Sequence, residues 1–289
     1  MTGTLYIVAT PIGNLEDITQ RALRVLGEVD LIACEDTRHT RKLLKHFGIK
    51  TRTISYHEHN ERERAEQLGQ LLIAGKNVAV VSDAGTPLIN DPGFRVVNSA
   101  IERNVSVVPI PGPSALVAAL SAAGLPSDQF FFAGFLPARA NTRRSKLEEL
   151  ASVPATLIFY EAPHRIAATV RDAFEILGNR DAVIAREVTK LHEEFARGKL
   201  SELAESLSGT KNARGEMVVL IGGANAENRA SFEANETASR SGRLVKRVRD
   251  LQSSGMDSKI ALKQAARELG FKRDEAYRLM LAQKNRRSR

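Results

Sequence analysis

NVAVVSDAGTPLINDPG, at residues 77–93, is a short apolar run that breaks abruptly into a loop. Its four residues Val78–Val81 are continuously apolar, which is typical of a strand buried on both faces of a sheet. The loop that begins at Asp83 cannot continue this strand, because Gly85 lacks a side chain and Pro87 has no N–H to donate. In α/β sheets, small molecules bind beside the carboxyl ends of parallel strands. The stretch therefore predicts a strand of a parallel sheet followed by a ligand-binding loop.

The same pattern occurs twice more in the first half of the chain. TLYIVA at residues 4–9 ends in TPIGN, and VSVVPI at residues 105–110 ends in PGPSA. An Ala- and Leu-rich segment at 116–123 then predicts a helix, with Ser114 as its N-terminal cap. One such loop is an ordinary turn between a strand and a helix. Three of them predict that three strand ends converge on one pocket.

Size and composition limit the class of protein. The chain has 289 residues, 43% of them hydrophobic, which is enough for two domains with sizeable cores. No apolar run approaches the thickness of a bilayer, and the first residues lack the pattern of a secretion signal. Cys34 is the single cysteine, which excludes a disulfide or a Cys-based zinc site within one chain. We therefore expect a cytoplasmic protein that does not associate with membranes.

The order of the elements predicts an α/β fold. Strand-like runs alternate with helical patterns at 19–26, 40–47 and 62–74, which favours a largely parallel sheet with helices on both faces. A second strand-rich series follows a connector near residue 124. We predict an N-terminal α/β domain over 1–123, a second α/β domain over 124–224 with a cleft between the two, a polar linker over 225–241 and a basic helical domain over 242–289. The last would hold three short helices at 243–251, 258–269 and 274–283, with Asp257 or Ser258 capping the second and Gly270 ending it.

Charge distinguishes the C-terminal tail, residues 225–289, from the rest of the chain. Residues 1–224 carry 26 Lys and Arg against 26 Asp and Glu, whereas residues 225–289 carry 16 against 8, so the whole net charge of +8 lies in the tail. Such a concentration of positive charge favours binding to a phosphate backbone. On charge alone, a solvated surface that serves only solubility is equally consistent.

Charged residues also stand where several predicted strands end. Glu35, Asp36 and Arg38 follow the run LIAC, and Glu187 and Lys190 follow DAVIA. Catalytic groups often stand at such positions. For Asp36 and Thr37 taken singly, however, helix capping and surface ion pairs are the simpler interpretation.

The segment HEHN at 57–60 raises the question of a metal. His57 and His59 could share one face of a strand, but no clear third ligand accompanies them, so no metal site is expected. The fingerprints GxGxxG and GxxxxGK[ST] are absent, which argues against ordinary dinucleotide and P-loop triphosphate binding.

Seven motifs in order identify a family resemblance. TPIGNL, EDTRHTRKLL, SYHEHN, SDAGTPLINDPG, PGPSA, FYEAPHR and REVTK, spread over about residues 3–224, resemble the tetrapyrrole methylase superfamily of S-adenosylmethionine-dependent enzymes. The closest resemblance is to the branch that methylates a ribose 2′-hydroxyl of a cytidine in 16S ribosomal RNA. Members of that branch more often have Met or Leu in place of Val188.

The resemblance implies two α/β domains of the tetrapyrrole methylase type, with S-adenosylmethionine in the cleft between them, and a homodimer. The cofactor-binding residues carried over from the motifs are Pro11, Gly13, Asp83, Ala84, Gly85, Thr86, Pro87, Leu88, Pro111, Ser114, Ala115, Tyr160 and Glu161. The partner would be 16S ribosomal RNA, either free or in an assembled small subunit.

The reaction requires an aligned ribose oxygen and a group that removes its proton or stabilises the developing alkoxide. Position and chemistry leave six candidates for this catalytic role: Glu35, Asp36, Arg38, His57, Glu187 and Lys190. Contacts to RNA phosphates are expected from the tail, at Arg243, Lys246, Arg247, Lys259, Lys263, Lys272 and Arg273.

Two other functions remain open at this point. The superfamily fold also serves tetrapyrrole substrates, although the basic tail and the segments EDTR and SYHEHN argue against one here. A non-catalytic RNA-binding protein with a vestigial cleft is the alternative from another class.

Overall fold

A computed structural model describes residues 1–208, 215–224, 243–254, 256–271 and 276. The chain divides into two compact units, the first made of residues 1–148 and 155–223 and the second of residues 149–154 and 224–289. The finer division of the first unit near residue 123 stays a prediction. Within the described residues, no helix has the length and apolar character that crossing a bilayer requires.

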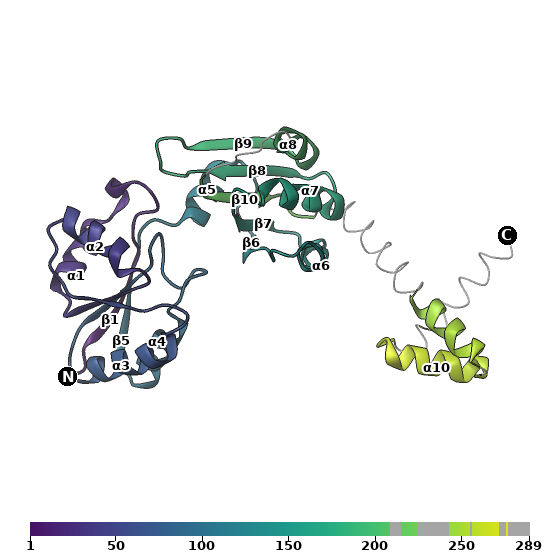
Figure 1. Ribbon diagram of the computed structural model, residues 1–289, viewed down its shortest axis with the longest axis horizontal. Helices are drawn as coiled ribbons and strands as arrows, with labels where there is room; N and C mark the ends of the chain where they lie inside the picture. The colour runs from purple at the N-terminus through teal and green to yellow at the C-terminus, as the bar shows by residue number, and fades with distance from the viewer. Residues whose placement is uncertain (209–214, 225–242, 255, 272–275, 277–289) are drawn as a thin grey trace. The chain divides into compact units, whose positions relative to one another are not determined.

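The first unit contains a fully parallel five-stranded sheet (Figure 1). Its strand order is β3-β2-β4-β1-β5. The strands are β1 (Thr4–Val8), β2 (Leu31–Cys34), β3 (Thr53–Ser55), β4 (Val78–Val81) and β5 (Ser106–Ile110). The helices that connect and follow them are α1 (Gln20–Glu28), α2 (Thr37–His46), α3 (Glu61–Ile73), α4 (Phe94–Glu102) and α5 (Ala115–Ala123). The predicted helices at 19–26, 40–47, 62–74 and 116–123 correspond to α1, α2, α3 and α5.

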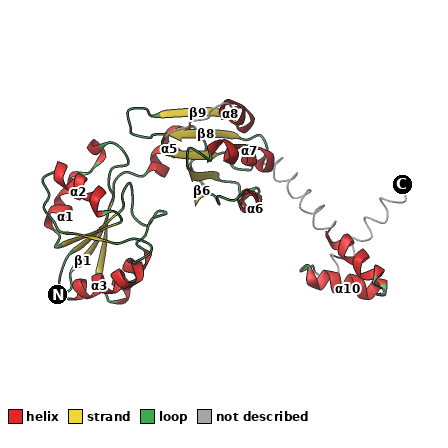
Figure 2. Ribbon diagram, in the orientation of Figure 1, coloured by secondary structure: helices red, strands yellow, loops and turns green. Residues whose placement is uncertain are grey.

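Helices cover both faces of this sheet (Figure 2). Successive residues of a strand point to opposite faces, so each strand contributes to a core on either side. On β4, Val78 and Val80 belong to the core formed with α3 and α4, whereas Ala79 and Val81 belong to the core formed with α1 and α2. All four residues are buried. The continuous apolar run in the sequence is thus explained by a strand that has no solvent-facing side.

The strand order brings the three predicted loops together. β4, β1 and β5 are neighbours in the sheet and run parallel, so the loops that follow them emerge side by side at one edge. β2, which pairs with the other side of β4, places Glu35 and Asp36 at the same edge. The predicted convergence of three strand ends is confirmed.

A second five-stranded sheet, with the order β6-β7-β10-β8-β9, is mixed rather than parallel. β10 lies at its centre and pairs antiparallel with both β7 and β8, while β6 and β7 are parallel. Its strands are β6 (Phe130–Phe135), β7 (Thr156–Glu161), β8 (Asp181–Arg186), β9 (Glu194–Lys199) and β10 (Met217–Ile221). Its helices are α6 (Ala140–Leu150), α7 (Ile166–Leu177) and α8 (Leu200–Leu207).

Helix α5 packs against one face of this second sheet. Leu116 and Leu120 of α5 share a core with Val183 of β8 and Leu220 of β10. Ser114 takes the N-cap position of α5, but its side chain makes no capping hydrogen bond, so the predicted cap is wrong in its chemistry. The residue lines a cavity instead.

The second unit has a small helical core. A helix at 243–253 and α10 (Ser258–Glu268) bury Leu244, Val248 and several alanines against each other. Asp257 caps α10 by accepting a hydrogen bond from the N–H of Lys259, and Gly270 has φ of 70° just beyond its end, as the sequence predicts. The third predicted helix, at 274–283, lies outside the described residues except for residue 276.

Replacement of Gly85, in the loop after β4, tests the backbone conformation of that loop. Its φ is 86°, and an added Cβ would lie 3.3 Å from Cγ2 of Ile12. We expect Gly85→Ala to lower the free energy of unfolding by about 1–2 kcal/mol, because a left-handed backbone is costly for any residue with a Cβ. Urea unfolding would measure the change.

The matched control is Gly27→Ala in α1, where an added Cβ meets nothing within 4 Å. That change should stabilise the chain by roughly 0.5–1 kcal/mol, since alanine is the better helix former. Equal stability of the two variants would contradict this account of Gly85.

Candidate functional site

Backbone hydrogen bonds join the loops that follow β1 and β4. The N–H of Thr10 donates to the carbonyl oxygen of Gly85 (2.9 Å), and the N–H of Gly85 donates to that of Thr10 (3.0 Å). The hydroxyl of Thr86 donates to the carbonyl oxygen of Pro113 (3.1 Å), which ties the β4 loop to the β5 loop. The three loops therefore form one bonded assembly rather than three independent turns.

A cavity of about 370 Å³ lies against this assembly. The sequence-predicted residues that line it are Glu35, Asp83, Ala84, Gly85, Thr86, Ser114, Ala115, Tyr160 and Glu161. Pro11 and Gly13 line a neighbouring cavity instead. Pro87, Leu88 and Pro111 line neither of these two cavities, and Leu88 packs against Gly93 within its own loop.

The cavity is lined by carboxylates. Among the described residues on its wall, five are acidic and none is Lys, Arg or His; the acidic ones are Glu35, Asp83, Asp91, Glu161 and Glu216. Burial, together with the nearby charge of Glu35, raises the pKa of Asp91 to about 6. Burial and the charge of Asp83 also raise the pKa of Glu35. Glu161 and Glu216 have cationic partners, whereas Glu35, Asp83 and Asp91 form no ion pair among the described residues, so these three carboxylates favour a cationic ligand.

Two of the predicted catalytic residues, Asp36 and Arg38, lie outside the cavity, and Asp36 contacts its wall. The backbone N–H of Asp36 donates to Oδ1 of Asp83 (3.1 Å). The Asp36 side chain caps α2 by accepting from the N–H of Arg38 (2.8 Å) and pairs with the Arg38 guanidinium (2.8 Å). Neither side chain lines the cavity. Their contacts match the capping interpretation of the sequence rather than the catalytic one.

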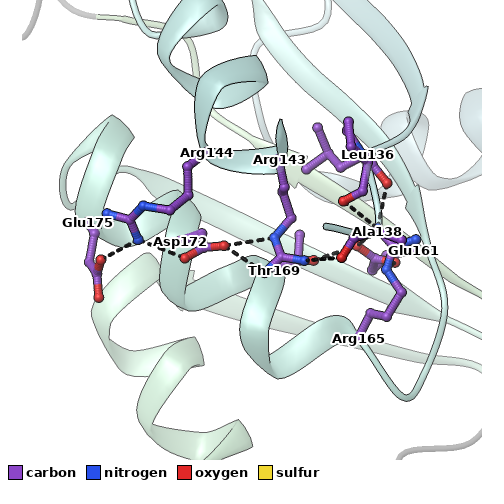
Figure 3. A network of polar contacts seen from close by, with 10 residues as sticks. Leu136, Ala138, Arg143, Arg144, Glu161, Arg165, Thr169, Asp172 and Glu175 are labelled. Atoms are coloured by element: carbon purple, nitrogen blue, oxygen red, sulfur yellow. Dashed lines mark hydrogen bonds and ion pairs between the residues drawn. The ribbon is translucent and has the colours of Figure 1, made fainter. Parts of the chain in front are cut away.

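Glu161, at the end of β7, is held by several hydrogen-bond and ion-pair partners (Figure 3). Its side chain is 1% exposed; it accepts from the N–H of Ala162 (2.7 Å) and from the hydroxyl of Thr169 (2.5 Å). Arg165 pairs with the carboxylate (3.2 Å) and donates to the carbonyl oxygen of Leu136. These bonds fix the position of a buried negative charge on the cavity wall.

A second ion-pair group lies to the left of Glu161 in the same view (Figure 3). Asp172 of α7 accepts from Arg143 (2.7 Å) and Arg144 (2.8 Å) of α6, and Arg144 also pairs with Glu175 (2.6 Å). Arg143 is 5% exposed and Asp172 is 8% exposed. Since a buried charge without its partner is strongly destabilising, these pairs lock α6 against α7.

Glu187 and Lys190 form a separate cluster. Nζ of Lys190 pairs with Glu187 (2.9 Å) and Glu216 (3.3 Å), and the pKa of Glu187 is lowered by its hydrogen bond from Lys190. The aliphatic part of Lys190 packs on Gly13. Lys190 and Glu216 line the neighbouring cavity of about 430 Å³, which shares Ile12, Asp83, Ala84 and Glu216 with the first.

His57 does not occupy the predicted strand face. β3 ends at Ser55, and residues 57–60 form a turn held by the side chain of Asn60, which accepts from the N–H of His57 (2.9 Å). The rings of His57 and His59 lie edge to face with centroids 6.0 Å apart. In the described part of the chain, no three His, Cys, Asp or Glu side chains gather as a metal site would require.

The second unit holds the predicted RNA contacts. Arg243, Lys246, Lys259 and Lys263 are exposed. Arg247 is half-buried and pairs with Glu268 (2.6 Å), so its charge is largely compensated. Lys272 and Arg273 lie outside the described residues.

Several residues of the cavity wall were not expected from the sequence. Asp91 stands in the same loop as Asp83, and its place in NDPG, directly before Pro92 and Gly93, is a signal that could have indicated it. The other unexpected wall residues are Ile89 and Asn90 of the same loop, Ile12 of the loop after β1, and seven residues of the second sheet and its loops: Phe135, Ala162, Pro163, Val188, Glu216, Met217 and Val218. Without the pairing of β7 with β10, nothing in the sequence associates residues 216–218 with this site.

The family is decided by comparison with known proteins. The family model for tetrapyrrole (corrin/porphyrin) methylases matches residues 4–204. The chain belongs to the tetrapyrrole methylase family. The resemblance of the seven sequence motifs is thereby confirmed.

Within the tetrapyrrole methylase family, the chain is similar to proteins named ribosomal RNA small subunit methyltransferase I. The one from Halalkalibacterium halodurans is 48% identical over 277 residues, covering 96% of this chain and 94% of the relative. The one from Pseudomonas aeruginosa is 48% identical over 281 residues, covering 96% and 97%.

A solved structure of the same fold is that of uroporphyrin-III C-methyltransferase from Thermus thermophilus in complex with S-adenosylhomocysteine. It has a TM-score of 0.53 and 21% identity, and the match covers 75% of this chain and 97% of that one. At this identity the likeness establishes the fold alone, which agrees with the predicted α/β architecture.

Asp91→Asn tests the electrostatics of the cavity. With a folded-state pKa of about 6, above the ordinary value near 3.9, Asp91 destabilises the folded chain increasingly as the pH rises from about 4 through 6. We therefore expect the variant to melt on the order of 2–4 °C higher than the natural chain at pH 8, which corresponds to about 1 kcal/mol, and to match it at pH 4.

The control is Asp128→Asn at an exposed site, which should change the melting temperature little at either pH. A pH-independent difference between Asp91→Asn and the natural chain would contradict the raised pKa.

Proposed function

We propose that the chain uses S-adenosylmethionine to methylate a ribose 2′-hydroxyl of a cytidine in 16S ribosomal RNA. The proposal is supported by an acidic cavity built on the bonded loops after β1, β4 and β5. The chain that holds this cavity is 48% identical, over nearly its full length, to proteins named for methylating the ribosomal RNA of the small subunit.

The cavity fits S-adenosylmethionine in size and charge. Pockets for small ligands begin near 300 Å³, and this one has about 370 Å³. The cofactor has a sulfonium and an ammonium against one carboxylate, so its net charge complements a wall of carboxylates. Ile12, Val188 and Val218 provide apolar surface for its adenine, and the backbone N–H of Ala115, at the start of α5, is placed to bind its carboxylate.

When bound, S-adenosylmethionine supplies an electrophilic methyl group. The chain must then orient the ribose hydroxyl and accept its proton. Asp91 suits the second task, because it lines the cavity and its pKa of about 6 leaves it ionised at neutral pH while still basic enough to take a proton. Of the six catalytic candidates from the sequence, Glu35 is the one that shares this wall, and its charge helps to raise the pKa of Asp91.

The proposal extends to the setting of the reaction. The name of the relatives supports a ribosomal substrate, and with it a cytoplasmic location. β6 is an edge strand with Phe130 and Phe131 exposed, which supports a homodimer that covers them. The exposed Arg243, Lys246, Lys259 and Lys263 of the tail support phosphate contacts there.

A transfer assay tests the proposed function. The protein is incubated with S-adenosylmethionine carrying a labelled methyl group and, separately, with assembled small subunits, naked 16S ribosomal RNA or a porphyrinogen. We expect label only in RNA, resistant to alkali at one position because a 2′-O-methyl group blocks strand cleavage there. Label in the porphyrinogen would support the tetrapyrrole alternative, and no transfer to any acceptor would support the RNA-binding one.

Deleting residues 225–289 tests the role of the tail. At moderate salt the shortened chain should bind 16S ribosomal RNA at least tenfold more weakly, since it loses a net charge of +8, while its affinity for S-adenosylhomocysteine stays within about twofold. Filter binding would measure the affinity for RNA, and calorimetry would measure the affinity for S-adenosylhomocysteine. Unchanged RNA affinity would exclude the tail as an RNA-binding element.

A further inference from the structure

The balanced charge of residues 1–224 conceals one strongly basic segment. Residues 37–52 contain six Lys and Arg and no Asp or Glu, which leaves 20 Lys and Arg against 26 Asp and Glu in the rest of 1–224. This segment comprises α2 and the turn that leads to β3. The first unit is therefore polarised rather than neutral.

Five side chains of this segment form what we call the basic strip. They are Arg41, Lys42, Lys45, Lys50 and Arg52, and all five are exposed. Within the described part of the chain none of them forms an ion pair; Arg41 donates one hydrogen bond, to the hydroxyl of Thr53 (3.2 Å). Charges that only solubilise a surface are commonly interspersed with acidic groups, and here no acid is present to compensate them.

The shape of the surface suits an extended anion. Four members of the basic strip, all except Lys42, line a single open hollow of about 720 Å³ that runs from α2 to the start of β3. Its other walls are small or apolar residues with no carboxylate. A phosphate chain lying in this hollow would meet only positive side chains and neutral groups.

The position of α2 connects this hollow to the acidic cavity. Lys42 lies on the other side of the helix and, with His39 and His46, lines the 430 Å³ cavity that shares Asp83 and Ala84 with the acidic one. A polyanion is repelled by the acidic wall and attracted by α2. The cationic methyl donor and the anionic substrate are thus directed to adjoining places by opposite fields.

We propose that the basic strip binds the phosphate backbone of the RNA beside the target nucleotide and so presents its ribose to the acidic cavity. This inference rests on the proposed function and adds a second RNA-binding element to the tail. An acidic protein surface would also be attracted to the basic strip, but the 2′-hydroxyl to be methylated comes with its own phosphates, which makes RNA the matching partner.

The test is Lys42→Gln with Lys45→Gln in the full chain. The probe is a fluorescent fragment of 16S ribosomal RNA, and its affinity is measured over a range of salt concentrations. Losing two phosphate contacts should lower the slope of log affinity against log salt by about 1.4 and weaken binding on the order of tenfold near 0.1 M salt. Affinity for S-adenosylhomocysteine and the melting temperature should not change.

The matched control is Arg62→Gln with Arg171→Gln, which removes two exposed charges on α3 and α7, away from the hollow and both cavities. It should keep the natural slope. Lys50→Gln with Arg52→Gln, at the far end of the basic strip, should reduce the slope as the first pair does, and it replaces that pair if the first pair misfolds.

The outcomes separate this inference from the proposed function. If the natural chain methylates RNA but the strip variants keep the natural salt slope, the basic strip touches no phosphate and the inference is wrong, while the proposed function stands. If the natural chain transfers no methyl group to RNA, the proposed function is wrong and the inference falls with it.

Discussion

Two backbone hydrogen bonds between Thr10 and Gly85 join the first and fourth strands beyond the end of the sheet. Each strand end alone would be a flexible turn, but this pairing makes the two loops a single rigid element, to which the hydroxyl of Thr86 attaches the third loop through Pro113. The pairing requires a left-handed backbone at residue 85, which is why glycine stands there. The cavity wall exists because these peptide groups bond to each other rather than to water.

Electrostatics organises the surroundings of this wall. Carboxylates are gathered into the cavity at a cost visible in the raised pKa of Asp91 and Glu35, and Glu161 is held there by Thr169 and Arg165. A site that holds unfavourable charge in its empty form gains stability when a cation arrives, so the cavity stores part of its binding energy in advance. The exposed cations of α2 have no such cost, because water already solvates them.

The first sheet and its loops could be predicted because their signals are local. Residues Val78–Val81 place apolar side chains on both faces of the sheet, and the Gly and Pro residues that follow show where the strand ends. Strand order depends on contacts between distant segments. The sequence therefore contains no signal that β10 pairs antiparallel between β7 and β8, or that Met217 and Val218 contribute to the cavity wall. The place of Asp91 in the loop after β4 is a local signal, but its raised pKa depends on burial and on the charge of Glu35, which follows another strand.

The central place of β10 in the second sheet has a consequence for the order in which the molecule is made. All strands of the first sheet precede residue 111, so that sheet can form while the chain is still being synthesised. The second sheet has its middle strand last, at Met217–Ile221, and until these residues emerge β7 and β8 have no partner between them. The acidic cavity is therefore the last part of the first unit to close, and a chain that stops early would lack the site at which we propose that the methyl donor binds.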